Sequence, residues 1–472
     1  MTPLFSLHRR RVLAALGALG GGALPALFAP EAHADDYKAL VCVFLFGGND
    51  GLNTVVPLDA RYTPYAAVRG RLALPKSSLI RLGGTDFGLH PSLASLASLS
   101  GASGRLAALF NTGPLVAPLT RADYLAAKGR GPGVPGSLFS HSDQQTLWEA
   151  GSADLQARTG WGGRAAGQMQ MRNPVISVGG NGRFGLSDSA VPLVLPSPGE
   201  YFGAHAMADT SGALAKRKLA LQALYAGNAG NGETPLMSAF AAQQRDAFEV
   251  SDRLRDLVWL SPGQQALTAP LDTAFAPLIR DGKFTNPLAS QLYQVAKLVL
   301  GRAVVGGSRQ IFFAQQGGYD THNAQIADDV LQGQHAGLLK GLGDALAAFD
   351  AAMQAIGMGN AVTLFTQSDF GRTFAPNASD GTDHAWGNTQ LVLGGAVKGG
   401  AHGRFPELAL GGPDDVGVES WERHGRWLPS ASVDQYAATL LRWLGASEAQ
   451  LDATLPNLRN FGSARSLGFM QA

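Results

Sequence analysis

The chain has 472 residues, a formal net charge of +1 and charged side chains at only 15% of its positions. This weak and balanced charge excludes the basic surface of a nucleic-acid-binding protein and the polybasic patch of a membrane-surface protein. The single cysteine, Cys42, excludes an intrachain disulfide and lies in an apolar run, so we expect a buried core thiol.

The first 34 residues predict a twin-arginine signal peptide. Consecutive arginines at 9–11 precede an apolar, Gly/Ala-rich run at 12–28, and residues 32–34 (Ala-His-Ala) form a small-x-small cleavage pattern. The apolar run is short and rich in Gly and Pro for a membrane span. The alternative is an N-terminal anchor that is never cleaved.

This signal predicts a periplasmic or secreted protein that meets the twin-arginine translocase during export. The route resembles the bacterial pathway for proteins that are exported folded, often with a cofactor already loaded, so we expect a metal or cofactor site. No later run reaches transmembrane length, and the mature protein from Asp35 onward is expected to be soluble without a stable membrane span.

The mature part, about 440 residues, is long enough for one large domain with insertions or for two smaller domains. Helical patterns lie between the apolar runs: residues 329–356 carry one apolar stripe, and Ser432 with Gln435 forms a capping box for a helix that ends at Gly445. Strands alternating with long helices predict an α/β fold with a mostly parallel central sheet flanked by helices. The predicted strands, in chain order, are 39–46, 105–110, 174–178, 310–314, 361–366 and 389–393, of which 174–178 and 389–393 have the weaker patterns.

Residues 183–301 read mainly as helices and loops. Because no clean linker bounds them, we interpret this stretch as a helical cap or insertion on one α/β domain that covers residues 35–472.

Acidic side chains follow three of the predicted strands. Asp50 follows the first strand, Asp320 and His322 follow 310–314, and Asp369 follows 361–366. A further pair, Asp383 with His384, precedes the strand at 389–393. Loops at the carboxyl edge of a parallel sheet converge, and carboxylates with imidazoles are ligands for a divalent metal. For each aspartate alone, a solvated turn residue or a helix cap is the alternative.

Two other histidines have structural interpretations. His335 lies on the apolar stripe of its helix, which favours a core histidine, and His90 in a Leu-His-Pro turn favours a loop contact.

Ser140 precedes a helix predicted over residues 144–150. A serine there is either an N-cap or, with a metal present, a nucleophile close to the positive end of the helix dipole.

Five segments in order resemble the DUF1501 family over essentially the whole mature chain. They are FGGNDGLNTVVP (46–57), SHSDQQTLWEAG (140–151), GGYDTHNAQ (317–325), SDFGRT (368–373) and GTDHAWGN (381–388). Members of this family commonly carry twin-arginine signals.

More distantly, the order of elements is similar to that of the alkaline phosphatase–sulfatase superfamily, whose members hydrolyse phosphate or sulfate esters at one-metal or two-metal sites. This resemblance implies an alkaline-phosphatase-like fold and Ser140 as the nucleophile. It also implies five metal ligands, which are Asp50, Asp320, His322, Asp369 and His384.

The chain departs from the superfamily pattern at two points. Phe370 stands where that superfamily usually has a histidine, and Asp320 and His322 are closer in sequence than the usual Asp-x-x-x-His. Asp383 or His335 is then the candidate to compensate, or the site holds one metal or none. Arg372 is the candidate to neutralise charge by a bidentate contact with an anionic oxygen.

These observations predict an exported metal-dependent hydrolase of small anionic phosphate or sulfate esters. Ser140 attacks the ester, a divalent metal (Zn, Mn, Mg or Ca) activates the serine hydroxyl, and Arg372 stabilises the anionic oxygens of the ester. The alternative is a non-catalytic cell-envelope binding or assembly protein that keeps the fold with a degraded metal site.

Overall fold

The computed structural model describes residues 36–101, 104–203, 211–227, 235–417 and 422–471. The predicted signal peptide at 1–34 lies outside the described residues. Within them, none of the helices is both long and apolar enough to cross a membrane.

A large, mostly parallel sheet forms the centre of the described structure. Its strand order is β13-β5-β12-β11-β1-β10-β6-β7, with β14 paired to the far end of β5. Only β12 runs against its neighbours. The strands are β1 (Lys38–Leu45), β5 (Leu106–Gly113), β6 (Ile176–Ser177), β7 (Leu193–Val194), β10 (Arg309–Gln316), β11 (Val362–Ser368), β12 (Asn388–Leu393), β13 (Gly400–His402) and β14 (Ala431–Ser432). All six predicted strands are therefore confirmed, and so is the mostly parallel α/β sheet.

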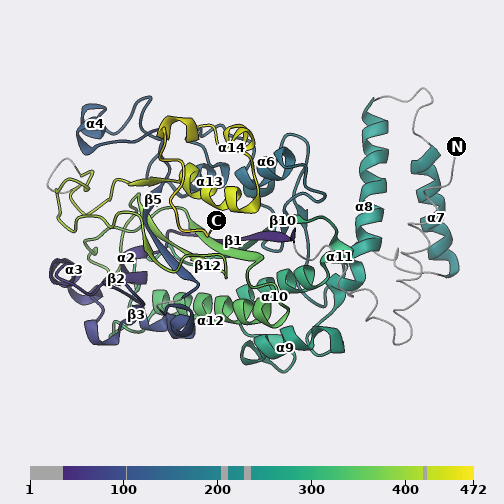
Figure 1. The fold of residues 1–472 in the computed structure, drawn as a ribbon, viewed down its shortest axis with the longest axis horizontal. Helices are drawn as coiled ribbons and strands as arrows, with labels where there is room; N and C mark the ends of the chain where they lie inside the picture. The colour runs from purple at the N-terminus through teal and green to yellow at the C-terminus, as the bar shows by residue number, and fades with distance from the viewer. Residues whose placement is uncertain (1–35, 102–103, 204–210, 228–234, 418–421, 472) are drawn as a thin grey trace.

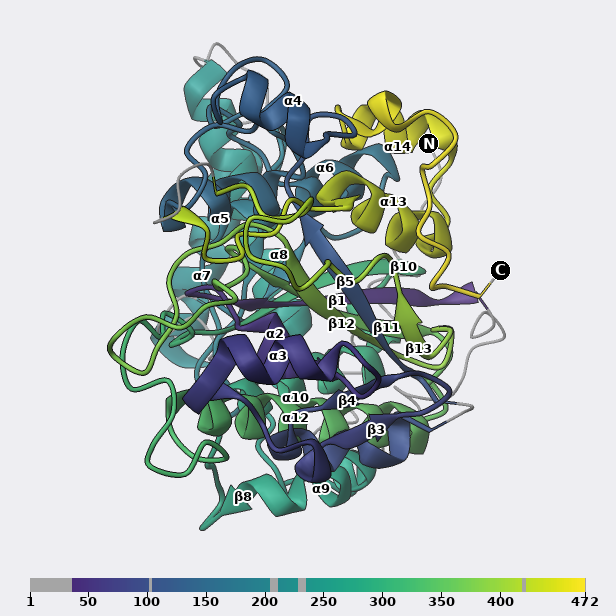
Figure 2. The ribbon, with the colours of Figure 1, turned by 90° about the vertical axis from the view of Figure 1, so that its left-hand side faces the viewer.

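Strand β1 is the central strand and is buried on both faces. Ala39 and Val41 contact one hydrophobic core, whereas Leu40 and Cys42 contact the other. Figures 1 and 2 show helices α10 (Pro287–Leu300) and α12 (Gln334–Ala355) on one face, with α6 (Trp161–Gln168), α13 (Val433–Leu444) and α14 (Glu448–Thr454) on the other. This double burial explains the nearly continuous apolar sequence of β1. Cys42 is a buried core thiol as expected, and burial raises its pKa well above the ordinary value.

The predicted helix ends are partly confirmed. Ser432 and Gln435 form the capping box of α13, and Gly445 ends that helix with φ of 111°. Helix α12 begins at Gln334, five residues later than 329, because residues 321–333 instead form the loop that follows β10.

Helices dominate the stretch at 183–301. Helices α7 (Gly212–Gly227) and α8 (Pro235–Trp259) pack against each other and lie apart from the sheet at the right of Figure 1. Lys218 of α7 forms an ion pair with Asp252 of α8. The remaining helices and strands are α2 (Gly51–Thr54), α3 (Tyr62–Arg69), α4 (Arg121–Ala126), α5 (His141–Ala150), α9 (Ala269–Phe275), α11 (Arg302–Val305), a small sheet of β2 (Val55–Pro57), β4 (Phe87–Leu89) and β3 (Ile80–Leu82), and the hairpin of β8 (Ile279–Arg280) and β9 (Lys283–Phe284).

Glu149, in the last turn of α5, predicts a pH dependence of stability. The side chain is buried and accepts a hydrogen bond from the Arg183 N–H, and burial raises its pKa to about 7. The folded chain therefore holds a proton that the unfolded chain releases above pH 4.5, the ordinary pKa of a glutamate side chain. The stability that this proton gives is complete below pH 4.5 and is lost as the pH rises to about 7, by up to ~1.4 kcal/mol per pH unit.

Urea unfolding at pH 5 and pH 7 measures this effect. We expect Glu149→Gln to be no more stable than the wild type at pH 5 and clearly more stable at pH 7. An equal difference between the two proteins at both pH values contradicts the prediction.

Candidate metal centre

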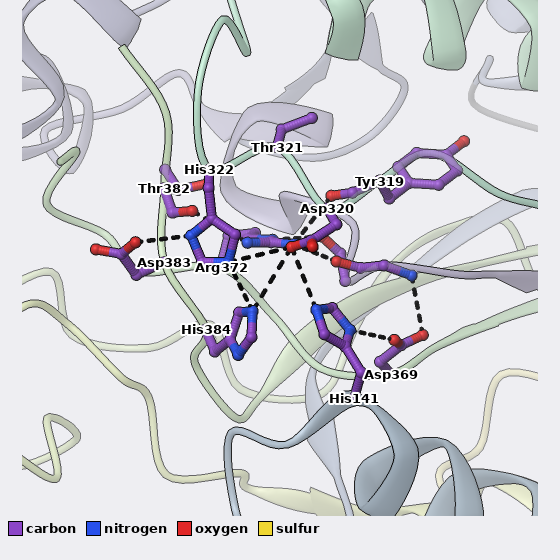
Figure 3. A network of polar contacts seen from close by, with 12 residues as sticks. His141, Tyr319, Asp320, Thr321, His322, Asp369, Arg372, Thr382, Asp383 and His384 are labelled. Carbon is purple, nitrogen blue, oxygen red and sulfur yellow. Dashed lines mark hydrogen bonds and ion pairs between the residues drawn. The ribbon is translucent and has the colours of Figure 1, made fainter. Parts of the chain in front are cut away.

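Four side chains converge beyond the carboxyl edge of the central sheet. They are His141, Asp320, His322 and His384, and their candidate ligand atoms all lie within 4.8 Å of one another. His141 is the first residue of α5, Asp320 and His322 follow β10, and His384 precedes β12. Figure 3 shows the three imidazoles grouped around the Asp320 carboxylate. The Nε2 atoms of His141 and His322 each lie 3.2 Å from Asp320 Oδ1, and that of His384 lies 3.6 Å away.

A hydrogen bond at Nδ1 orients each imidazole. The Nδ1 of His141 donates to Asp369 Oδ2 at 2.7 Å, and that of His322 donates to Asp383 Oδ1 at 2.8 Å. His384 donates from Nδ1 to the Phe139 carbonyl at 2.6 Å. Because carboxylates and carbonyls accept, each Nδ1 donates, so each Nε2 faces the centre and offers a lone pair there when its imidazole is neutral. Histidines that bind metals are oriented in this way.

The free lone pairs fit a cation. The Nε2 atoms of His322 and His384 lie only 2.8 Å apart, and the buried Nε2 of His141 has no hydrogen-bond partner. At this separation either a proton or a metal ion lies between the two nitrogens, because two bare lone pairs would repel each other. Three imidazole nitrogens and one carboxylate are a common donor set for a divalent transition metal.

Charges around the centre shift the pKa values of its members. Burial alone raises the pKa of Asp320, but the hydrogen bond and charge of Arg372, with the nearby His141 and His322, lower it overall. The hydrogen bond to Asp369 raises the pKa of His141 despite burial. Burial lowers the pKa of His384. Asp320 is thus ionised at neutral pH and offers a full negative charge.

Arg372 lies beneath the centre with no exposed side-chain surface. Its guanidinium donates to the carbonyls of Gly47, Gly48, Tyr319 and Thr382, and to Asp320 Oδ1. These contacts join the loops after β1 and β10 and balance the Asp320 charge. A direct contact between Arg372 and a substrate oxygen stays a prediction, and one that these contacts do not favour.

Two of the five predicted ligands lie outside the cluster. Asp369 is fully buried and accepts from His141, from Gln145 Nε2 at 2.8 Å and from the Gly47 N–H at 3.1 Å, so it supports His141. Asp50 is also fully buried. It forms a two-point ion pair with Arg69 at 2.7 and 2.8 Å. The structure therefore brings together Asp320, His322 and His384 of the predicted set.

His141 is the member that sequence reasoning missed. It follows Ser140 directly and precedes the helix predicted over 144–150, whereas α5 begins at His141 itself. Ser140 occupies the N-cap position, but its side chain makes no capping hydrogen bond. Its Oγ lies 3.4 Å from Ser142 Oγ. A histidine beside that serine, in a chain rich in Asp/His loops, was the available signal.

The Phe370 side chain packs against two of the imidazoles, those of His141 and His384. Its buried ring lies 4.7 Å from the His141 ring and 4.5 Å from the His384 ring, measured between centroids. The cluster thus has three imidazoles despite the phenylalanine, because His141 arrives from α5. Neither of the residues expected to compensate is a member of it: Asp383 orients His322, and His335 is a core histidine.

The two histidines that were given structural interpretations are both buried. His335 lies with its Nε2 3.0 Å from Asn49 Oδ1, and burial lowers its pKa to about 4. His90 accepts a hydrogen bond from the Ser92 N–H, as a loop contact does. Both interpretations are confirmed.

Gly48 gives a test of the contact with Phe370. Its φ is +82°, and a Cβ at this position would lie 2.4 Å from the Phe370 ring. We expect Gly48→Ala to lose about 1–2 kcal/mol of unfolding free energy from the left-handed backbone, and more from the displaced ring. Gly84→Ala is the control, because Gly84 has φ of +73° with open space around it. Chemical denaturation of both variants measures the difference, and equal losses would mean that Phe370 moves aside freely.

A family model described as "Protein of unknown function (DUF1501)" matches residues 84–419, a range that includes all four members of the cluster. No curated protein matches the chain. Among solved structures, one described as "Crystal structure of Ps i-CgsB in complex with k-i-k-neocarrahexaose" is similar at 11% identity, covering 90% of this chain and 77% of that chain with a TM-score of 0.34. A likeness of this extent carries no argument about function.

Proposed function

The chain belongs to the DUF1501 family, and we propose that it is an exported metal-dependent hydrolase of small phosphate or sulfate esters. The observation that carries the proposal is the convergence of three imidazole nitrogens and one carboxylate, whose candidate ligand atoms lie within 4.8 Å of one another. We also propose export through the twin-arginine translocase to the periplasm or beyond, on the signal at residues 1–34.

His141, Asp320, His322 and His384 would hold one divalent ion. A bound ion supplies Lewis acidity, which polarises an ester oxygen and lowers the pKa of a hydroxyl or a water in contact with it. Three imidazoles favour zinc or another transition metal over magnesium or calcium, which prefer oxygen ligands. Asp50 and Asp369 are committed to other partners, which favours one ion over two.

The side chains around the centre suit a small anionic ester. The Asp320 and His322 side chains are 49% and 40% exposed, so a substrate reaches them from solvent. Ser140 is the candidate nucleophile, because it precedes the ligand His141 directly and lies at the N-terminus of α5, where the helix dipole favours negative charge. In this proposal the arrangement is alkaline-phosphatase-like, with Arg372 acting through the charge of Asp320.

A second candidate is an envelope binding or assembly protein on the same fold. The commitment of the Arg372 guanidinium to four carbonyls and Asp320 favours it, because the arginine is then not available to stabilise the anionic oxygens of an ester beside the metal ion.

Metal analysis of the exported protein, followed by a panel of phosphate and sulfate ester substrates, separates the two candidates. For the hydrolase, we expect one metal ion per chain and turnover that is lost in both Ser140→Ala and Asp320→Ala. Metal without turnover of any ester favours the binding protein. A metal-free and inert protein removes the hydrolase proposal.

A further inference from the structure

Gln325 is fully buried on the chain segment that carries His322, where it contacts the segment that carries His384. Its Nε2 donates to Asp50 Oδ2 at 2.7 Å. Its Oε1 accepts from two hydroxyls, Thr321 Oγ1 at 3.1 Å and Thr382 Oγ1 at 2.7 Å. Both polar atoms of this amide are therefore directed at fixed partners through three hydrogen bonds.

The orientation of the Gln325 amide is imposed by its neighbours. The Asp50 carboxylate is held as an anion by the two-point ion pair with Arg69, so it only accepts hydrogen bonds. The NH₂ group of Gln325 must face that carboxylate, which leaves its oxygen for the two threonine hydroxyls. The buried Asp50–Arg69 pair therefore acts on the cluster indirectly, through Gln325, although neither residue contacts the four clustered side chains.

Each threonine directly precedes a part of the metal centre. Thr321 is followed by His322, and Thr382 is followed by Asp383 and His384. The two segments also meet through their backbones, because the Thr382 N–H donates to the Thr321 carbonyl at 3.1 Å. The Gln325 amide oxygen thus joins the segment of His322 to the segment of His384. The second segment also carries Asp383, the carboxylate that orients His322.

We infer that Gln325 is a positioning residue that sets the spacing of His322 and His384 by clamping Thr321 and Thr382. The inference rests on the proposed function, because the spacing matters for a metal ligand set. Hydrogen-bonded supports of metal ligands commonly change affinity by about 10–100-fold when they are removed.

Titration with Co²⁺, followed by its visible absorption, tests the inference on the full chain. Gln325→Met keeps the volume and removes the clamp, and we expect about 10–100-fold weaker cobalt binding with an altered absorption spectrum. Gln310→Met is the matched control. Gln310 is equally buried and joins Asn173 to the Pro174 carbonyl, but it lies at the start of β10, away from the centre. This control should leave both cobalt affinity and spectrum unchanged.

Thr382 supplies a second test that is gentler on the fold. We expect Thr382→Val, which lacks the hydroxyl, to weaken cobalt binding, and Thr382→Ser, which keeps it, to restore wild-type affinity and spectrum. If Gln325→Met and Thr382→Val both bind cobalt like the wild type, the inference is overturned.

The metal-free protein keeps the inference separate from the proposed function. If the wild type takes up no cobalt, the metal centre fails, and the imidazole ¹⁵N and ¹H NMR signals of His322 and His384 decide the role of Gln325. Signals that shift in Gln325→Met but not in Gln310→Met support positioning, whereas unchanged signals overturn it.

Discussion

We expect zinc binding to fall by at least about 100-fold when His322 is replaced by alanine, because the change removes one of the four candidate donors. Removing only the support, in Asp383→Asn, weakens binding less, by about 10–100-fold, since the imidazole stays but its Nδ1 hydrogen bond is weaker. Isothermal titration calorimetry with zinc measures both values and the number of ions per chain.

His402→Ala is the control for that experiment. His402 is a histidine outside the cluster, and its Nε2 lies 2.7 Å from the Lys398 carbonyl. Its variant should bind zinc like the wild type. If all three variants bind zinc equally well, the ion lies elsewhere and the assignment of the centre is wrong.

Arg69→Met lowers the free energy of unfolding by about 3–5 kcal/mol, the second large effect that we expect. Both side chains of the Arg69–Asp50 pair have no exposed surface, so the substitution leaves a buried carboxylate without its cation. The double variant Asp50→Asn with Arg69→Met is expected to lose less than the single variant, because no uncompensated charge is left. Urea denaturation with extrapolation to water measures each value.

A nearby exposed pair supplies the comparison. Arg71 forms an ion pair with Asp380, and these side chains are 62% and 40% exposed. Arg71→Met should change the unfolding free energy by no more than about 1 kcal/mol. Similar losses for Arg69→Met and Arg71→Met would show that burial of the Asp50 pair does not control its contribution.

The central part of the fold could be predicted because its strands are buried on both faces. A strand such as β1 has almost no polar position, so its sequence alone identifies it. Strands β7, β13 and β14 could not be found in this way. They have only two or three residues each, and pairing with β5 or β6 creates them. The predicted helix at 329–356 begins five residues too early for a related reason: long-range contacts, such as that of Gln325 with Asp50, hold residues 321–333 as a loop.

The candidate site could be predicted where sheet topology alone decides position. Asp320 and His322 follow a parallel strand, and the carboxyl edge of the sheet is where such residues meet. His141 is the first residue of helix α5, and no local sequence pattern shows where that helix packs against the sheet. Asp50 also follows a strand, but its carboxylate forms an ion pair with Arg69 of α3 instead of joining the cluster. Sequence patterns do not show which of two buried partners a carboxylate meets.

The position of β1 between β10 and β11 has a consequence for the time at which the metal centre can form. The first strand of the described chain has both of its neighbours in the second half, with Ala39 beside Gln310 on one side and Val362 on the other. Contacts of such long sequence separation form slowly and late. During synthesis, the four side chains of the cluster cannot meet until His384 has left the ribosome, so no shorter nascent chain holds the complete set. The twin-arginine export that we propose would suit such a chain, because that route would carry a folded protein in which the cluster is already complete.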